Sequence, residues 1–123
     1  QQTDKNYTII HAVDGFDEVS MTCDFKTFNK KGEVLNRIAD LGFEEIKVSE
    51  IQGGDTVESS AKIFTTILNG EGTNAQINVV LCNAALAIQT IKQNVSFADC
   101  YYEAEESLMS KKALNSFKKL IGD

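Results

Sequence analysis

The sequence has few basic residues and no block of them. Its 123 residues include 12 Lys and Arg against 18 Asp and Glu, which gives a formal net charge of −6. Binding to nucleic acid or to an anionic membrane surface requires clustered Lys and Arg that neutralise phosphates. The composition therefore argues against a nucleic-acid partner and against a membrane partner.

The sequence also lacks the patterns of disulfide-rich, zinc-binding and membrane proteins. Its three cysteines, Cys23, Cys82 and Cys100, are widely spaced and form no C-x-x-C pair. Two of them lie in apolar helical segments, so we interpret them as buried, reduced thiols of a cytosolic protein. No uninterrupted apolar run approaches the ~18–20 residues that a bilayer requires, and no signal peptide or lipidation motif is present. These features predict a cytoplasmic protein.

The chain contains no proline and does not begin with Met. It enters a predicted strand as early as Tyr7. We expect this start to be a cut through a larger protein, although a processed or tagged mature chain would begin in a similar way. The composition, 42% hydrophobic and 24% charged, is that of one ordinary soluble domain. We therefore treat residues 1–123 as a single partial domain.

The longest apolar segment, residues 74–91, predicts a helix at the centre of the domain. Its apolar residues are spread around the helix rather than along one stripe, so neighbours should cover most of its sides. Thr73 and Gln76 form a T-x-x-Q capping box at its start. Asn83 is the polar exception in the middle. Because an unpaired buried amide costs roughly 1–3 kcal/mol, we expect Asn83 to hydrogen-bond to nearby groups and to lock the core.

Residues 1–52 are predicted to form a strand and hairpin region. The first strand, residues 7–12, has an almost unbroken apolar centre, which suggests burial on both faces. A hairpin turn is expected at residues 30–33. Further strands or short extended pieces are predicted at residues 19–22, 25–29, 34–35 and 46–48.

Residues 53–123 are predicted to form a helical region. A glycine pair at residues 53–54 permits a sharp entry into the first helix, with Asp55 as N-cap and Gly70 as its stop. A third helix begins after Ser96, and a last amphipathic segment follows it. The first helix is expected to place Val57, Ala61, Phe64, Ile67 and Leu68 on one face. The fold class is therefore α/β, with a few strands followed by three to four packed helices.

The pattern best suited to chemistry is the acidic turn at residues 14–18, Asp-Gly-Phe-Asp-Glu. Adjacent Asp17 and Glu18 on irregular backbone can both face one point in space. Hard oxygen ligands of this kind hold Mg²⁺ and leave several of its sites for water or phosphate. The alternative is a solvated acidic turn, which is the more frequent case for an Asp-Gly sequence considered on its residues alone.

Other polar groups favour structural roles. The glycine pair resembles a phosphate loop, but Asp55 would occupy the position of the anion, so capping is favoured. His11, the only histidine, lies in or next to an apolar strand without an identifiable nucleophile, which favours a structural role over that of a catalytic base. Because no zinc-ligand spacing, G-x-S-x-G elbow or Walker loop is present, no residue is assigned a catalytic role.

Six segments together resemble the anthranilate phosphoribosyltransferases of tryptophan biosynthesis. Each segment is weak alone, but they follow the family's order and cover nearly the whole chain. They are IIHAVDGFDEVS (9–20), ADLGF (39–43), GGDTVESSAKIF (53–64), ILNGEG (67–72), NVVLCNAALAI (78–88) and SKKAL (110–114). The chain is therefore similar to a C-terminal fragment of that family. The fold implied is the C-terminal portion of a nucleoside phosphorylase/phosphoribosyltransferase-type α/β domain, whose strands belong to a larger mixed sheet.

The resemblance implies a glycosyltransferase (pentosyltransferase) of amino-acid biosynthesis. The complete enzyme would transfer the phosphoribosyl group from phosphoribosyl diphosphate to anthranilate, with Mg²⁺ as cofactor. Asp17 and Glu18 stand at the family's two acidic, metal-binding positions. The family's glycine-rich diphosphate loop, its Lys-His loop and its anthranilate-contacting residues are not found in these 123 residues. Substrate-binding residues are therefore not assigned, and the isolated chain is expected to be inactive.

The sequence departs from the family at a few positions. Ala12 and Val13 stand where a His-Gly pair is usual, Lys111 stands where glycine is common, and a proline near Ile38 is lost. Two alternatives remain: a fragment of a pyrimidine nucleoside phosphorylase-like enzyme, and a non-catalytic binding module that retains the fold. The segments G-E-G-T and N-A-A-L favour the anthranilate enzyme over the phosphorylase.

The apolar first strand also predicts self-association. Residues 7–12 are too apolar for a solvent-facing strand, and in a complete enzyme their neighbours would come from upstream strands. We expect isolated copies of the chain to cover this edge by pairing with one another.

Overall fold

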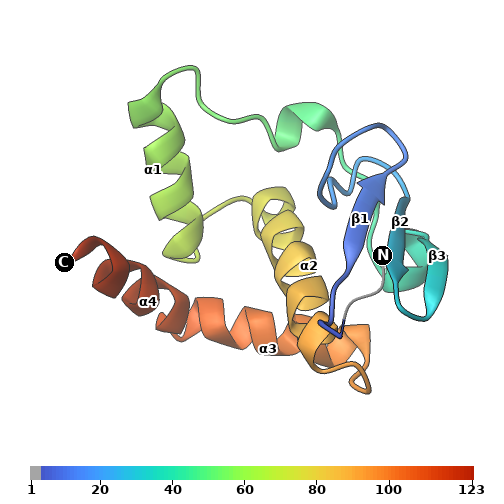
Figure 1. Cartoon of the computed structure of the whole chain (residues 1–123). Helices are drawn as coiled ribbons and strands as arrows, with labels where there is room; N and C mark the ends of the chain where they lie inside the picture. Colours follow the sequence, from blue (N-terminus) through green and yellow to red (C-terminus); the bar gives the residue numbers. More distant parts are fainter. Residues whose placement is uncertain (1–3) are drawn as a thin grey trace.

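The computed structural model describes residues 4–123 and contains a three-stranded antiparallel sheet and four helices, which confirms the predicted α/β class. Figure 1 shows α2 in the middle, with the sheet on one side and α1 and α4 on the other. The strands are β1 (Ile9–Ala12), β2 (Phe25–Asn29) and β3 (Gly32–Asn36). The helices are α1 (Val57–Leu68), α2 (Asn74–Ile91), α3 (Phe97–Met109) and α4 (Lys112–Ile121), and short 3-10 turns span Ala39–Leu41 and Val48–Glu50.

The sheet has the order β1-β2-β3, with β2 in the centre. In the register of β1 and β2, Ala12 lies opposite Phe25, and in that of β2 and β3, Asn29 lies opposite Gly32. The predicted hairpin between β2 and β3 is therefore confirmed. Phe25 is 1% exposed and belongs to the core, which explains why β2 holds the sheet against the helices.

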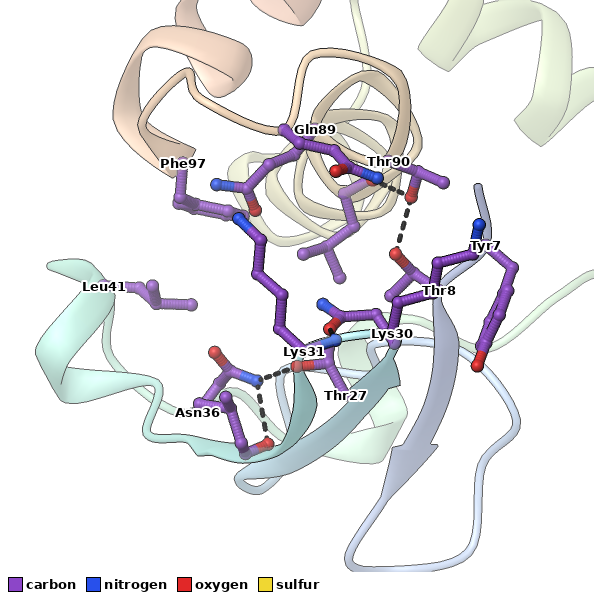
Figure 2. Close-up of a pocket in the computed structure, with 14 residues that line it drawn as sticks. Tyr7, Thr8, Thr27, Lys30, Lys31, Asn36, Leu41, Gln89, Thr90 and Phe97 are labelled. Carbon is purple, nitrogen blue, oxygen red and sulfur yellow. Dashed lines mark hydrogen bonds between the residues drawn. The ribbon is translucent and has the colours of Figure 1, made fainter. Parts of the chain in front are cut away.

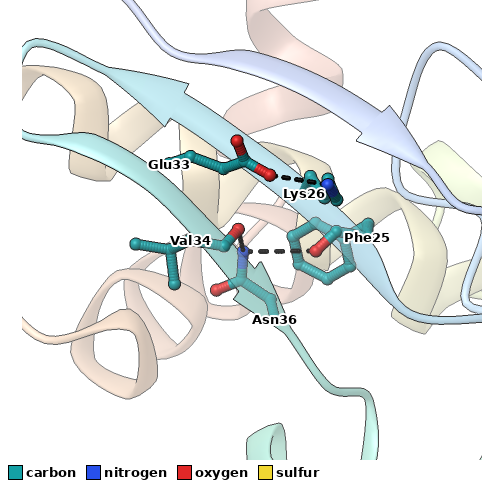
Figure 3. A network of polar contacts seen from close by, with 5 residues as sticks. All are labelled: Phe25, Lys26, Glu33, Val34 and Asn36. Atoms are coloured by element: carbon teal, nitrogen blue, oxygen red, sulfur yellow. Dashed lines mark hydrogen bonds and ion pairs between the residues drawn. The ribbon is translucent and has the colours of Figure 1, made fainter.

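Polar contacts fix the register of the hairpin (Figure 3). The side-chain amide of Asn36 donates to Thr27 Oγ1 at 3.0 Å and to the Phe25 carbonyl at 3.4 Å. Lys26 Nζ lies 2.6 Å from Glu33 Oε1, but both side chains are about half exposed. Exposed ion pairs of this kind contribute only about 0–1 kcal/mol. We therefore attribute the register mainly to the backbone ladder, the buried Phe25 and the Asn36 amide.

β1 differs from its prediction in length and in burial. The strand begins at Ile9 rather than at Tyr7, and its side chains alternate between exposed and buried positions. Ile9 is 59% exposed whereas Ala12 is fully buried. The expectation of burial on both faces was therefore wrong for the described part of the chain, because only one face of this sheet is covered by helices.

Two predicted extended pieces are not strands. Residues 19–22 alternate in sequence, but their backbone groups pair with other parts of the chain: Val19 with the side chain of Asn83, and the Met21 carbonyl with the amide of Ile46 at 3.0 Å. Met21 adopts a φ of 61°, which no strand residue has. Val48, predicted to end an extended piece, instead begins a 3-10 turn.

α2 forms at the predicted residues and joins two hydrophobic cores. Cys82 and Leu86 pack with buried residues of the sheet region, including Phe25. Ile77 and Leu81 pack with Ala104 and Leu108 of α3. Full burial of a leucine-sized side chain contributes roughly 1.5–3 kcal/mol, so the two cores together account for much of the fold's stability.

The cover around α2 is incomplete on a third side. Val80 is 41% exposed and Ile91 is 78% exposed, so the expectation that most sides are covered holds only for the two core-facing sides. None of the helices within residues 4–123 is long and apolar enough to cross a membrane.

The helix starts follow the local sequence closely. Thr73 caps α2, as predicted. Its Oγ1 accepts a hydrogen bond from the amide of Gln76, and Gln76 Oε1 accepts one from the amide of Thr73. The cap of α1 is Thr56 and not Asp55, because Thr56 Oγ1 accepts from the amide of Ser59 while Ser59 Oγ accepts from the amide of Thr56. This reciprocal pair satisfies two amides at once, as in a capping box.

α1 and α4 are the least buried helices. Neither contains a buried residue, and Val57 of the predicted apolar face is 83% exposed. An aromatic contact between Phe64 and Phe117, with ring centroids 5.0 Å apart, joins the two helices. The predicted face of α1 therefore meets α4 at Phe64 and the core between α2 and α3 at Leu68, which is partly buried there.

A contact between two helix junctions orders this end of the molecule. Lys111, between α3 and α4, has a left-handed φ of 67°, and its ammonium group donates to the carbonyl of Asn69 at the end of α1. Left-handed backbone costs roughly 1–2 kcal/mol for residues other than glycine, which gives a physical reason why glycine suits this position. Gly70 ends α1 with a φ of 71°, as its role as a helix stop predicts.

We expect Gly70→Ala to lower the free energy of unfolding by about 1–2 kcal/mol. The new methyl group would sit on left-handed backbone and lie 3.2 Å from the sulfur of Met109. Urea denaturation followed by circular dichroism would measure the change. Gly53→Ala is the matched control, because Gly53 has no positive φ and no atom within 4 Å of the added carbon. Equal stability of the two variants would contradict the prediction.

Candidate functional site

The acidic turn begins where β1 ends. The amide of Ala12 donates to the carbonyl of Phe16 at 3.0 Å, and the amide of Gly15 donates to the carbonyl of Ala12 at 3.0 Å. Gly15 has a φ of 99°, a conformation that glycine reaches without steric cost. Phe16 is half-buried and packs against the core of the sheet region. The backbone of the turn is therefore held by hydrogen bonds and by the packing of Phe16, while its three acidic residues are exposed to solvent.

Asp14 points back into the turn. Its Oδ2 accepts a hydrogen bond from Thr22 Oγ1, and its amide donates to the sulfur of Cys23 at 3.3 Å. The Thr22 hydroxyl, as the main cause, holds the pKa of the Asp14 carboxyl below its usual value. Asp14 therefore remains ionised at neutral pH and ties the two arms of the turn together.

Asp17 and Glu18 lie at the tip of the turn and are both exposed. Neither carboxylate forms a hydrogen bond or an ion pair with another residue of 4–123. The sequence grouped three carboxylates, and the structure separates them: Asp14 bonds within the turn, whereas Asp17 and Glu18 are accessible to a ligand. What remains is a pair of adjacent carboxylates on ordered backbone.

Two carboxylates alone suit a cation such as Mg²⁺, which keeps water or phosphate among its ligands. They do not suit a cation that needs all of its ligands from the protein. Within residues 4–123, no group of three or more His, Cys, Asp or Glu side chains is arranged to hold a metal ion. Mg²⁺ is commonly bound by one or two carboxylates, with water and substrate phosphates in the other positions. Two exposed carboxylates without competing partners satisfy that requirement.

The residue after Glu18 is anchored to α2. Val19 is fully buried, its amide donates to Asn83 Oδ1 at 3.0 Å, and its carbonyl accepts from Asn83 Nδ2 at 2.8 Å. The expectation that Asn83 hydrogen-bonds and locks the core is confirmed. Its partner was not foreseen, because the two residues are 64 positions apart and no local pattern links them.

The remaining candidates show no arrangement for chemistry. His11 is exposed on β1 and lies opposite Lys26. Gly54 packs tightly against the start of α1, where an added carbon would lie 2.1 Å from Ser59 Oγ. The first turn of that helix is capped by Thr56, as described above. Gly54 thus serves the packing of α1, whereas an added carbon at Gly53 would meet no atom within 4 Å.

The cysteines are free thiols. Cys82 and Cys100 are buried and Cys23 is half-buried. Burial raises the pKa of the Cys82 thiol to about 12, so it stays protonated and unreactive at neutral pH. Cys23 donates to the carbonyl of Asp24 at 3.1 Å, and desolvation raises the pKa of its thiol as well. These properties agree with the interpretation of the cysteines as structural thiols.

The structure also shows a pocket that the sequence did not indicate. Its volume is about 290 Å³, and it lies between the β2–β3 hairpin and the C-terminal end of α2 (Figure 2). Thr8, just before β1, also lines the pocket, and its hydroxyl lies 2.7 Å from that of Thr90 in α2. The sequence feature that could have indicated this pocket is the change from apolar to polar residues at the end of α2, at Gln89, Thr90 and Gln93. Asp17 and Glu18 do not line this pocket.

Comparisons with known proteins agree with this architecture. Residues 3–114 match the family model described as "Glycosyl transferase family, a/b domain". The chain is 51% identical over 120 residues to the anthranilate phosphoribosyltransferase of Christiangramia forsetii and 45% identical over 120 residues to that of Flavobacterium psychrophilum. Each match covers 98% of this chain and 36% of the relative, so the chain spans about a third of the length of these proteins.

Solved structures show the same fold. The anthranilate phosphoribosyltransferase of Thermus thermophilus superposes with a TM-score of 0.82 at 19% identity, over 94% of this chain and 34% of that one. The enzyme of Saccharomyces cerevisiae in complex with PRPP and Mg gives a TM-score of 0.80 at 22% identity, over 90% of this chain and 32% of that one. The chain therefore belongs to the glycosyl transferase family defined by this a/b domain, and it is similar over nearly its whole length to the C-terminal part of the anthranilate phosphoribosyltransferases.

Proposed function

We propose that this chain is the C-terminal part of an enzyme that transfers a phosphoribosyl group from phosphoribosyl diphosphate to anthranilate, in tryptophan biosynthesis. The observation that carries the proposal is the pair of exposed carboxylates, Asp17 and Glu18, on an ordered turn within a chain 51% identical to such a transferase. Solved relatives contain PRPP and Mg in one case and 4-fluoroanthranilate in another.

In this proposal Asp17 and Glu18 would be the residues that hold Mg²⁺ when the diphosphate donor binds. When bound, the ion neutralises charge on the diphosphate as it leaves. The chain's own contribution is to present two carboxylates in fixed positions. Asp14 is the third carboxylate of the turn, and its bonds to Thr22 and Cys23 keep the backbone before the pair in place.

The transfer exchanges one bond at the ribose C1 for another. The amine nitrogen of anthranilate bonds to C1, the bond from C1 to the diphosphate oxygen breaks and diphosphate leaves, and the proton released from the nitrogen passes to water. As the leaving group departs, positive charge develops on C1, so the two substrates must be aligned at that moment. The residues for this alignment are not among the described candidates, and we place them in other parts of the complete protein.

We also infer a cytoplasmic location. The support comes from Cys82 and Cys100, which are buried as free thiols. Reduced, unpaired cysteines in a protein core are typical of compartments that keep thiols reduced.

We expect the 123-residue chain alone to show no transfer of phosphoribosyl groups to anthranilate. It offers a metal-binding turn but no diphosphate loop, and holding two reactants in register accounts for about 7–11 kcal/mol of a barrier. The assay follows loss of anthranilate fluorescence with phosphoribosyl diphosphate and Mg²⁺ present. The complete enzyme in the same buffer is the positive control, and turnover by the isolated chain would refute the expectation.

In the complete enzyme, Asp17→Asn and Glu18→Gln should each raise the Mg²⁺ concentration for half-maximal rate at least ~10-fold. The reason is the loss of a charged ligand at an exposed site that contributes little to packing. Glu44→Gln and Glu45→Gln are matched controls, because they remove charge from another exposed acidic pair. If the Asp17 and Glu18 variants kept the wild-type Mg²⁺ dependence, the turn would be no more than a solvated loop.

We further propose that the isolated chain self-associates through the edge of β1. Within residues 4–123, β1 pairs with β2 on one side only, and Ile9 on this strand is 59% exposed. An exposed apolar edge is a template for pairing with a second copy.

Sedimentation equilibrium at tens of micromolar should therefore show a mass that rises with concentration. Ile9→Lys should shift the equilibrium to monomer, because a charged residue on an edge strand discourages pairing. Val57→Lys is the control, since Val57 is exposed on α1, away from the sheet. A wild-type chain that stays monomeric at every concentration would rule out this proposal.

A further inference from the structure

The side chain of Asn83 makes a two-point contact with the backbone of Val19. Oδ1 accepts from the Val19 amide at 3.0 Å, while Nδ2 donates to the Val19 carbonyl at 2.8 Å. The second hydrogen on Nδ2 goes to the carbonyl of Val79, one turn earlier in α2, at 2.9 Å. If the Asn83 amide were flipped, its NH2 group would face the N–H of Val19 and its oxygen would face the Val19 carbonyl, so neither bond could form. The two bonds therefore define the orientation of the amide.

This contact takes the place of a strand partner. Val19 lies in the segment that alternates like a strand but pairs with no neighbouring strand. Its two backbone groups are buried and would each cost about 1–3 kcal/mol if left unpaired. Outside its own helix, the bonds of the Asn83 side chain go only to Val19, among the residues of 4–123. The amide in this apolar helix therefore holds the backbone of the turn against α2.

The two acidic residues lie between two anchored points. On one side, the carbonyl of Phe16 accepts from the amide of Ala12 at 3.0 Å. On the other side, Val19 is held by Asn83. Asp17 and Glu18 are the residues between these anchors, so their backbone has little freedom to rearrange.

We propose that Asn83 is a positioning residue for the metal-binding carboxylates of Asp17 and Glu18. This inference rests on the proposed function. Two adjacent carboxylates repel each other and would separate on a flexible loop, which would weaken a shared cation site. By fixing the backbone directly after Glu18, Asn83 reduces the ordering that binding of the cation would otherwise require. The Asn83 side chain bonds to the backbone of Val19 and not to either carboxylate, so it acts through the turn.

The test uses the complete enzyme with Asn83→Leu, which has a similar size but no hydrogen-bonding groups. Asn83→Ser is a milder second variant, since its shorter side chain cannot reach both groups of Val19. The control is Asn78→Leu. Asn78 lies on the same helix and accepts from the hydroxyl of Tyr101 at 2.9 Å, so this change removes a part-buried hydrogen bond on the α3 side of α2.

Two readouts separate positioning from general stability. Mn²⁺ binding, measured by electron paramagnetic resonance with phosphoribosyl diphosphate present, reports the site without turnover. Hydrogen exchange of the Val19 amide reports the anchor itself. We expect both Asn83 variants to weaken Mn²⁺ binding at least ~10-fold, as loss of an orienting partner does at metal sites, and to speed exchange at Val19. Asn78→Leu should lower the melting temperature but change Mn²⁺ binding less than twofold.

The outcomes distinguish this inference from the proposed function. If Asp17→Asn and Glu18→Gln abolish Mn²⁺ binding while the Asn83 variants retain it, the positioning role is refuted and the metal site stands. If Asn78→Leu weakens binding as much as Asn83→Leu, the effect is general destabilisation, and the positioning role is again refuted. If Asp17→Asn and Glu18→Gln leave binding unchanged, the metal site itself is refuted, and the role of Asn83 with it.

Discussion

The sheet region and α3 are held together because α2 is buried between them. Neighbouring residues of the helix face opposite cores: Leu81 packs toward α3, and Cys82 packs toward the sheet. A helix with apolar residues around most of its circumference cannot satisfy them with a single neighbour. The sheet region and α3 are thus held in one structure by their common contact with α2.

The acidic turn uses the same helix in a different way. Its backbone leaves the sheet after Ala12, and a loop that enters the core must find partners for its polar groups. Asn83 supplies two of them at Val19, and the carbonyl of Met21 finds the amide of Ile46. With these groups satisfied inside, the loop can expose Asp17 and Glu18 without losing its shape. An irregular segment, rather than a strand, thus carries the candidate chemistry.

Local signals predicted the parts of the fold that local forces determine. The bounds of α2 and its Thr73 cap follow from apolar content and a capping box within one turn of chain. The alternation at residues 19–22 was misleading, because Val19, Ser20 and Met21 are all buried and the hydrogen bonds of Val19 and Met21 go to distant partners. The residues of the acidic turn could be read from the sequence, but the support from Asn83 could not, since periodicity carries no information about a contact across 64 positions.

That separation in sequence has a consequence for the order of events during synthesis. The turn leaves the ribosome well before Asn83, and translation at roughly 5–20 residues per second places several seconds between them. The delay is longer for Thr8, because its partner Thr90 follows it by 82 positions. The N-terminal strand and turn therefore emerge without the helix that anchors them, with apolar side chains such as Val19 uncovered. During that interval the segment would be accessible to chaperones that bind nascent chains, because its native contacts have not yet formed.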